Sequence, residues 1–456
     1  MLKTKIKQTI LVLGDLGVLA FSLYLTLIVR YQSWPSFERW HENSEAFLPV
    51  FATWLIVFYI NSLYQLKSFA HRGRWLESFF KSTLISFIVS ILFFYLFPFT
   101  SLSPRVTLII FVFIFTLADL GWRYMASDWL KNRLPKNNLA IVGYNQMIAE
   151  LAREIKNNPH LGYDLKFIIA EDEIAQAARN DGLLVFSADD NLEELASKHK
   201  INIIVLEKDI KTHTELHKKL FNCLPLGITY ISLASFFEYL TGRVPLDIIN
   251  RGWFLENLNL ADKKLFERAK RVSDLSLALF MLVITAAFWP LIALSIKLES
   301  RGPVFFKQMR LGKNNIPFVM YKFRTMKIEN NSFSPTAEAD KRITKIGNFL
   351  RKSRIDELPQ IINIIKSEMS LVGPRPERPE LIAELDRTIP FFSIRTLVKP
   401  GLSGWDQISG EYHSPDPADA YKKLQHDLYY IKNRTVYLDW TIVLKTIKTT
   451  LTYKGR

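Results

Sequence analysis

The chain has 456 residues, which is enough for two or three domains. Hydrophobic residues make up 49% of it, yet it carries a formal net charge of +15, so apolar and basic segments must be separated along the sequence. A single cysteine, Cys223, excludes an internal disulfide, argues against a cysteine-based zinc site and fits a reducing compartment. The basic excess suits contact with nucleic acid, anionic lipid or phosphorylated substrates, and composition does not choose among them.

Four apolar segments near the N-terminus predict transmembrane helices, at roughly 10–29, 47–66, 79–98 and 104–124. Each approaches the roughly 20 residues needed to cross a bilayer. The first segment is longer than the apolar core of a secretory signal peptide, and it ends in Arg30-Tyr31-Gln32 rather than in small residues. We therefore expect it to be retained. Asp15 and Asp119 lie within two of these segments; such residues usually face the interior of a bundle, and a packing role is favoured over a transport pathway.

Basic residues predict the orientation of these helices. The N-terminal cluster Lys3, Lys5 and Lys7 points inward. Four crossings return the chain inward at a second basic cluster, which consists of Arg123, Lys131, Arg133 and Lys136. The basic segment 67–74 also lies inside by this count, whereas the outer loops, at about 31–46 and 99–103, carry only Arg39. The pattern predicts that residues after the fourth helix face the cytoplasm.

The middle of the chain, 137–240, alternates short apolar runs with helical patterns, which indicates a parallel α/β sheet. The expected strands are 139–142, 165–170, 183–186, 201–206 and 228–233. A dinucleotide site would need Gly-x-Gly-x-x-Gly after the first strand. Here that turn has one glycine, Gly143, followed by Tyr144 and Asn145, whose side chains stand where a backbone should approach a pyrophosphate. We therefore expect a Rossmann-like domain that lacks the dinucleotide fingerprint.

A fifth apolar segment, 275–296, has basic residues on both sides and is interrupted by Trp289-Pro290. Proline kinks a helix because it removes a donor and clashes with the preceding turn. Two cytoplasmic flanks and a central break predict a re-entrant helix over 272–298, which enters one leaflet, bends at Trp289-Pro290 and exits on the same side. An ordinary kinked span is the alternative.

The C-terminal part, 299–456, holds dense motifs, among them the adjacent carboxylates Asp356 and Glu357. Isoleucines at helical spacing follow, with Pro359 in the first turn, so Asp356 is expected at or near a helix N-cap. Spacing alone favours a capping role. The basic neighbours Arg351, Lys352 and Arg354 instead suggest a phosphate site with an ionised, nucleophilic carboxylate, beside which a glutamate holds Mg²⁺.

Three further basic residues are candidate phosphate ligands. Arg375 lies between Pro374 and Pro376, which stiffen the turn that presents it, and such an arginine suits bidentate phosphate binding. A surface-loop arginine is the alternative. Lys322 and Arg324, two apart in a strand-like run, are expected to share one face. They either bind a diphosphate or lie on lipid headgroups.

With these motifs, residues 262–456 resemble the bacterial sugar transferase family, the monotopic polyprenyl-phosphate phosphoglycosyl transferases. The strings Asp-Glu-Leu-Pro-Gln at 356–360 and Met-Ser-Leu-Val-Gly-Pro-Arg-Pro at 369–376 are specific together. The whole chain is similar to the long-form members. The fold implied is a membrane protein of α plus α/β class, with a four-helix transmembrane bundle (1–130), a Rossmann-like domain (137–240) and a small α/β catalytic domain with the re-entrant helix (262–456).

The resemblance also implies a reaction. Asp356 would attack the sugar-bearing phosphate of a UDP-sugar and release UMP, and undecaprenyl phosphate would then take the phosphosugar from the aspartyl intermediate. Glu357 would hold Mg²⁺, with Lys322, Arg324, Arg351 and Arg375 around the phosphates. This reaction would start a surface polysaccharide such as O-antigen, capsule or exopolysaccharide.

The same resemblance implies a setting. The catalytic domain would lie on membrane lipid at the cytoplasmic face of the bacterial inner membrane, with no nucleic acid partner, and the Rossmann-like domain is expected to hold a homodimer together. Trp289 (usually serine), Lys341 (usually proline) and Asp406 depart from the family pattern. The segment 437–451 predicts an interfacial helix or one packed on the catalytic core. A non-catalytic membrane scaffold for polysaccharide export is the alternative function. Epimerases and Asp-x-Asp glycosyltransferases lack support because their motifs are absent from the sequence.

Overall fold

The computed structural model describes residues 2–64, 72–96, 104–132, 136–207, 214–258, 263–327, 340, 342–409 and 416–451. The chain divides into two compact units, Met1–Phe236 and Phe237–Arg456. The first contains a helical bundle and an α/β domain, and the second contains the motif-rich C-terminal part. Lys341 and the predicted outer loop at 99–103 lie outside the described residues.

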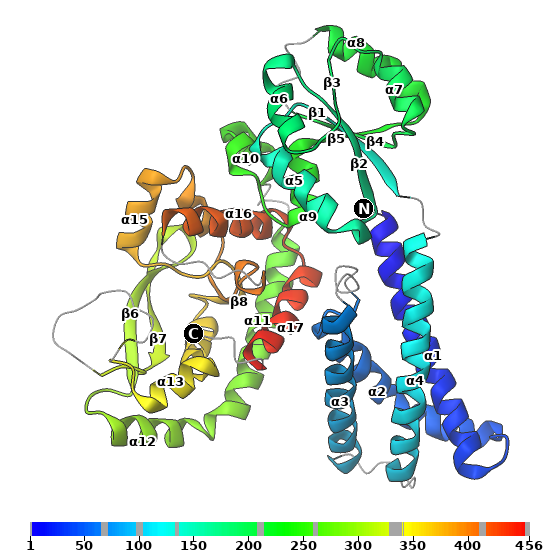
Figure 1. Ribbon diagram of the computed structural model, residues 1–456. Coiled ribbons are helices and arrows are strands. Elements are labelled where there is room, and N and C mark those ends of the chain that lie inside the picture. Colours follow the sequence, from blue (N-terminus) through cyan, green and yellow to red (C-terminus); the bar gives the residue numbers. More distant parts are fainter. Residues whose placement is uncertain are drawn as a thin grey trace. The chain divides into compact units, whose positions relative to one another are not determined.

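Four long apolar helices open the first unit, as predicted: α1 (Leu2–Tyr31), α2 (Phe37–Ile60), α3 (Arg72–Leu96) and α4 (Pro104–Asn132) (Figure 1). Each contains a stretch long and apolar enough to cross a bilayer. The predicted outer loop at 31–46 is wrong for most of its length, because α2 already begins at Phe37. Its polar first turns extend the helix beyond the apolar run, and the Ser36 side chain caps them by accepting a hydrogen bond from the Arg39 amide.

A buried ion cluster joins the helices of this bundle. Arg123 Nε donates to Asp119 at 2.8 Å, its Nη2 pairs with Asp15, and its Nη1 donates to the Leu63 carbonyl at 3.1 Å. All three charged side chains are at most 1% exposed. This geometry fits the packing role expected of the two aspartates, since one arginine ties α1 to α4. Arg123 therefore lies within the bundle, not in the basic inner loop where the charge pattern put it.

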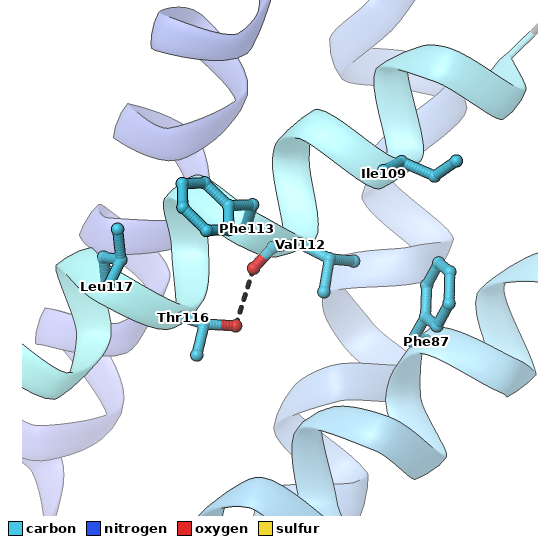
Figure 2. A pocket seen from close by; sticks show the side chains of 6 residues that line it. All are labelled: Phe87, Ile109, Val112, Phe113, Thr116 and Leu117. Atoms are coloured by element: carbon cyan, nitrogen blue, oxygen red, sulfur yellow. Dashed lines mark hydrogen bonds between the residues drawn. The ribbon is translucent and has the colours of Figure 1, made fainter.

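An apolar recess of about 300 Å³ lies between α3 and α4. Figure 2 shows its lining, which consists of Phe87, Ile109, Val112, Phe113, Thr116 and Leu117. The hydroxyl of Thr116, the one polar side chain among them, donates to the Val112 carbonyl at 2.6 Å. The recess therefore offers no free polar group to a sugar or a phosphate.

The α/β domain is a five-stranded parallel sheet in the order β3-β2-β1-β4-β5, with helices between its strands (Figure 1). Its strands are β1 (Asn137–Val142), β2 (Tyr163–Ile169), β3 (Val185–Phe186), β4 (Ile203–Leu206) and β5 (Thr229–Ser232). Its helices are α5 (Gln146–Asn157), α6 (Asp172–Asn180), α7 (Leu192–Lys198), α8 (Thr214–Asn222) and α9 (Leu233–Thr241). The order with the first strand at the centre is the doubly wound arrangement that the alternation predicts.

The turn after β1 is filled by the protein's own side chains. The Asn145 side chain caps α5 by accepting from the Ile148 amide, and its Nδ2 donates to Glu207 at 2.6 Å. A Cβ added to Gly143 would lie 2.3 Å from the Glu207 carboxylate. A pyrophosphate would need both the helix N-terminus and the space above this glycine. In this protein an amide and a carboxylate occupy them.

The second unit begins within α9 and continues with α10 (Arg251–Asn257). A pair of helices follows, α11 (Lys264–Ala286) and α12 (Trp289–Glu299), bent by 60°. The break falls directly before Trp289-Pro290, where the sequence predicts it. Pro290 lies in the first turn of α12, where a missing N–H costs no hydrogen bond. The Trp289 ring packs against Phe323 and Phe305, with centroid distances of 5.5 and 6.2 Å.

The rest of this unit surrounds two small sheets. The antiparallel strands β6 (Phe305–Leu311) and β7 (Pro317–Phe323) form a hairpin, and β8 (Ser370–Val372) pairs in parallel with β9 (Gly401–Ser403). The helices are α13 (Lys345–Lys352), α14 (Gln360–Ile365), α15 (Pro379–Thr388), α16 (Pro417–Asn433) and α17 (Val436–Leu451) (Figure 1). In α17, Ile442 is fully buried in the core of the unit, whereas Ile447 is exposed. The first half of α17 therefore packs on the core.

Candidate active site

Asp356 and Glu357 lie in a short 3₁₀ turn, Ile355–Glu357, between α13 and α14. Asp356 lies near the start of α14 but not at its N-cap, because α14 begins only at Gln360 and Pro359 takes the cap position. Arg354 has a left-handed backbone, with φ of 56°, and it reverses the chain directly before the two carboxylates. Neither acidic side chain forms a capping hydrogen bond. The capping role that spacing alone favoured is therefore absent.

Glu357 joins three segments of the chain. Lys322 Nζ, from β7, and Arg375 Nη2, from the loop after β8, each donate to Glu357 Oε1 at 2.7 Å. The Glu357 side chain is 10% exposed, and Lys322 is also largely buried, whereas Arg375 is 38% exposed, so its pair with Glu357 is less sheltered from solvent screening. Three of the residues that the motifs single out thus meet at one oxygen atom.

The two neighbouring carboxyls have opposite pKa shifts. Burial works against the charged form of Glu357, but Arg375 and Lys322 outweigh it and hold the pKa of this carboxyl well below its ordinary range. Burial, and then the charge of Glu357, raise the pKa of Asp356 to about 6, although nearby cations oppose this shift. Among the described residues, none donates a hydrogen bond to the Asp356 carboxylate. Asp356 is therefore the free, more basic member of the pair, which is the property required of a nucleophile.

The backbone of the Pro-Arg-Pro loop is fixed at three consecutive carbonyls. The Pro374 oxygen accepts from the Gly401 amide at 2.9 Å. The Arg375 oxygen accepts from Arg395 at 3.0 Å, and the Pro376 oxygen accepts from Arg310 at 3.1 Å. The stiffness expected from the two prolines is thus reinforced by hydrogen bonds, and the Arg375 side chain is held toward Glu357.

Sequence reasoning missed the ion network that supports this loop. Glu377 pairs with Lys423 and, at 3.3 Å, with Arg310, while Arg395 pairs with the buried Asp427 at 2.6 Å. Burial opposes ionisation of Glu377, but Lys423 and Arg395 lower its pKa to about 2. Glu377 directly follows Pro376 and could have been noticed for that reason. The others come from distant segments and carry no local pattern.

The two remaining basic candidates differ in their surroundings. Arg351, on α13, donates from Nε to the Thr325 hydroxyl at 2.9 Å, and its charge acts on Asp356. Arg324 lies two residues after Lys322, but the two side chains have different partners, since Lys322 binds Glu357. The Arg324 guanidinium donates to the carbonyls of Ser300 and Arg301. Asp406 is buried near His426, outside the carboxylate pair.

The available ligand side chains limit the ways in which this site could bind a metal ion. The described residues contain no group of three or more histidine, cysteine, aspartate or glutamate side chains that could hold an ion. Mg²⁺ in phosphate-transferring sites is often bound through one or two carboxylates together with substrate phosphates. Glu357 and Asp356 fit that mode, in which the diphosphate supplies the other ligands.

Two family models match the chain. The bacterial sugar transferase model matches residues 265–453, and a CoA-binding domain model matches residues 59–255. An uncharacterized sugar transferase of Bacillus subtilis, EpsL, is 38% identical over 186 residues, which are 41% of this chain and 89% of that protein. The chain belongs to the bacterial sugar transferase family, and its long form resembles that of the relatives described next.

Two longer relatives have named activities. A UDP-N-acetylgalactosamine-undecaprenyl-phosphate N-acetylgalactosaminephosphotransferase of Aeromonas hydrophila is 40% identical over 243 residues, 53% of this chain and 56% of the relative. A UDP-glucose:undecaprenyl-phosphate glucose-1-phosphate transferase of Xanthomonas campestris is 29% identical over 324 residues, 68% of this chain and 65% of the relative. The matches thus span between half and two thirds of these two proteins.

Proposed function

We propose that this protein transfers a sugar 1-phosphate from a UDP-sugar to undecaprenyl phosphate and releases UMP. The observation that carries the proposal is the placement of Lys322 and Arg375 on Glu357, directly beside Asp356, whose carboxylate accepts no hydrogen bond from the described residues. This arrangement offers a nucleophilic oxygen next to a cluster of positive charge. Phosphoryl transfer needs both, because charge on the phosphate oxygens must be neutralised as the nucleophile approaches.

The reaction proceeds in two displacements at one phosphorus atom. The Asp356 carboxylate attacks the sugar-bearing phosphorus of the UDP-sugar, the bond to the bridging oxygen breaks, and UMP leaves with the electron pair. The aspartyl phosphosugar is then attacked by a phosphate oxygen of undecaprenyl phosphate, and the Asp356 carboxylate departs unchanged. One phosphoanhydride replaces another, so the protein must lower a barrier and not supply energy.

The positive side chains have separate roles in this scheme. Arg375 and Lys322 hold Glu357 and face the diphosphate, and Arg351 adds a third charge near Asp356. Bound Mg²⁺ would neutralise phosphate charge, with Glu357 as its main protein ligand. The roles of Pro374 and Pro376 are to keep Arg375 in place.

The membrane setting belongs to the same proposal. The bent pair α11–α12 enters the cytoplasmic leaflet of the bacterial inner membrane and returns on the same side, which places the site near the lipid phosphate. Exposed apolar side chains on both arms and at the break between them support this, among them Phe280, Val283, Phe288, Leu291 and Leu294. A dimer formed through the Rossmann-like domain stays a prediction, as does the polysaccharide pathway that the product enters.

The test is UMP release by the full chain in nanodiscs with undecaprenyl phosphate and a panel of UDP-sugars, beginning with UDP-N-acetylgalactosamine and UDP-glucose. At least one sugar should give UMP, and Asp356→Asn and Glu357→Gln should abolish its release. A non-catalytic scaffold for polysaccharide export predicts no UMP from any sugar. Wild-type rates in both variants would also contradict the proposal.

A further inference from the structure

The Arg324 side chain binds the C-terminal end of α12, the second helix of the bent pair. Its Nη2 donates to the Ser300 carbonyl at 2.7 Å and its Nη1 to the Arg301 carbonyl at 2.9 Å, directly after α12 ends. The side chain is 5% exposed, and its Nε is buried. The cation thus meets the negative end of the α12 dipole, and its donors are turned away from solvent.

Glu299, the last residue of α12, forms a second link, which joins α12 to α13. Its two carboxylate oxygens accept from the backbone amides of Lys345 and Ile346, at 2.6 and 2.8 Å. These amides belong to the first turn of α13, whose donors have no partner within the helix. The C-terminal end of α12 is thereby joined to the N-terminal end of α13.

A third contact closes the arrangement into a ring. The Thr344 amide donates to the Thr325 carbonyl at 3.1 Å, and a Cβ on Gly347 would lie 2.0 Å from the same oxygen. Helix α13 therefore packs directly on the backbone beside Arg324. Helix α12, the segment Arg324–Thr325 and α13 are thus joined to one another. Arg351 lies on α13, and Lys322 lies on β7, two residues before Arg324.

We propose that Arg324 and Glu299 are positioning residues that clamp the membrane-entering arm α12 to the elements carrying Lys322 and Arg351. The inference rests on the proposed function, since it assigns to Arg324 the alignment of the site and not a phosphate contact. The arm and the site then move as one body. Anchoring α12 in the leaflet fixes the height and the direction of the cations that receive the diphosphate.

Two single variants and one conservative variant test the clamp in the full chain in nanodiscs. Arg324→Ala and Glu299→Ala each break one link, and Glu299→Gln keeps one acceptor oxygen for an α13 amide. Arg387→Ala removes an exposed arginine on α15 and serves as the control. Spin labels on Lys297→Cys and Lys352→Cys, both exposed positions, report the distance between α12 and α13 in a Cys223→Ala background.

Both alanine variants should broaden the distance distribution and lower kcat by about tenfold or more, as misplacement of a binding group does. The KM for the UDP-sugar should stay within about twofold, because no substrate contact is lost. Glu299→Gln should retain more activity than Glu299→Ala, and Arg387→Ala should match the wild type. This outcome also distinguishes the clamp from a local role of Arg324, since Glu299 is not among the predicted site residues.

A rise of tenfold or more in KM for Arg324→Ala, with a normal rate for Glu299→Ala and unchanged distances, would make Arg324 a phosphate ligand and overturn the proposal. Unchanged distances and rates in both variants would overturn it too. If the wild type turns over no UDP-sugar, the proposed function fails. The distance measurement still decides the clamp in that case.

Discussion

Replacing Lys322 with methionine separates two ways in which a cation supports the site. Lys322 holds Glu357 at 2.7 Å and also lowers the pKa of Asp356, which lies at about 6. A carboxyl with that pKa is about 90% ionised at pH 7. Loss of Lys322 raises the pKa of Asp356 and lowers this ionised fraction, and a higher pH restores it. Loss of a preorganised charge from the phosphate site costs about 100-fold or more, and we expect this effect to dominate.

The direction in which turnover changes with pH follows from the ionisation state that Asp356 needs in order to attack. Asp356 attacks as the carboxylate, so wild-type turnover should fall as the pH drops through about 6. In Lys322→Met this limb should move to higher pH, and a deficit of about 100-fold should remain on the plateau at pH 8. UMP release between pH 5 and 9 measures both, with Lys313→Met, at an exposed lysine of the same hairpin, as the control. A variant that recovers the wild-type rate at pH 8 would refute the reasoning.

Three further variants test other parts of the structure. Arg395→Ala leaves Asp427 buried without its partner and frees the Arg375 carbonyl, so we expect a loss of about 3–5 kcal/mol of stability in thermal unfolding and a fall in turnover; an unchanged melting temperature would contradict the role of the network. Arg123→Leu leaves two carboxylates buried in the bundle and should destabilise the protein by about 3–5 kcal/mol, which unfolding in detergent measures against Arg39→Leu in the first turn of α2. Single cysteines at Arg268 and Arg301 should both react with a membrane-impermeant maleimide only from the cytoplasmic side, whereas reaction from opposite sides would make α11–α12 a spanning helix.

Much of the fold follows from local patterns. Four apolar runs predict α1 to α4, strand–helix alternation predicts the parallel sheet, and Trp289-Pro290 predicts the break between α11 and α12. Each depends on periodicity or on proline chemistry, which act over a few residues. The start of α2 was wrong because a polar, well-capped turn extends a helix beyond its apolar run.

The site was predictable only where motif strings carry it. Asp356, Glu357 and Arg375 lie in such strings, and Lys322 lies in a short basic, strand-like run. The structure brings Glu357, Lys322 and Arg375 together at one carboxylate oxygen. The partners of Arg324 are the Ser300 and Arg301 carbonyls directly after α12, and they depend on tertiary packing that the spacing of Lys322 and Arg324 does not encode. The ion pair of Arg395 with Asp427 joins two segments through tertiary packing. No local spacing encodes such a contact.

The central claim is that Asp356 carries the phosphosugar during transfer. Mixing the protein with a UDP-sugar labelled at the sugar-bearing phosphate, without undecaprenyl phosphate, tests it most directly. The account predicts a burst of about one UMP per active site and a labelled peptide whose added mass is on Asp356. Asp356→Asn should give neither. Absence of the burst and of the label, with normal turnover once the lipid phosphate is added, would show direct transfer between substrates and would contradict the account.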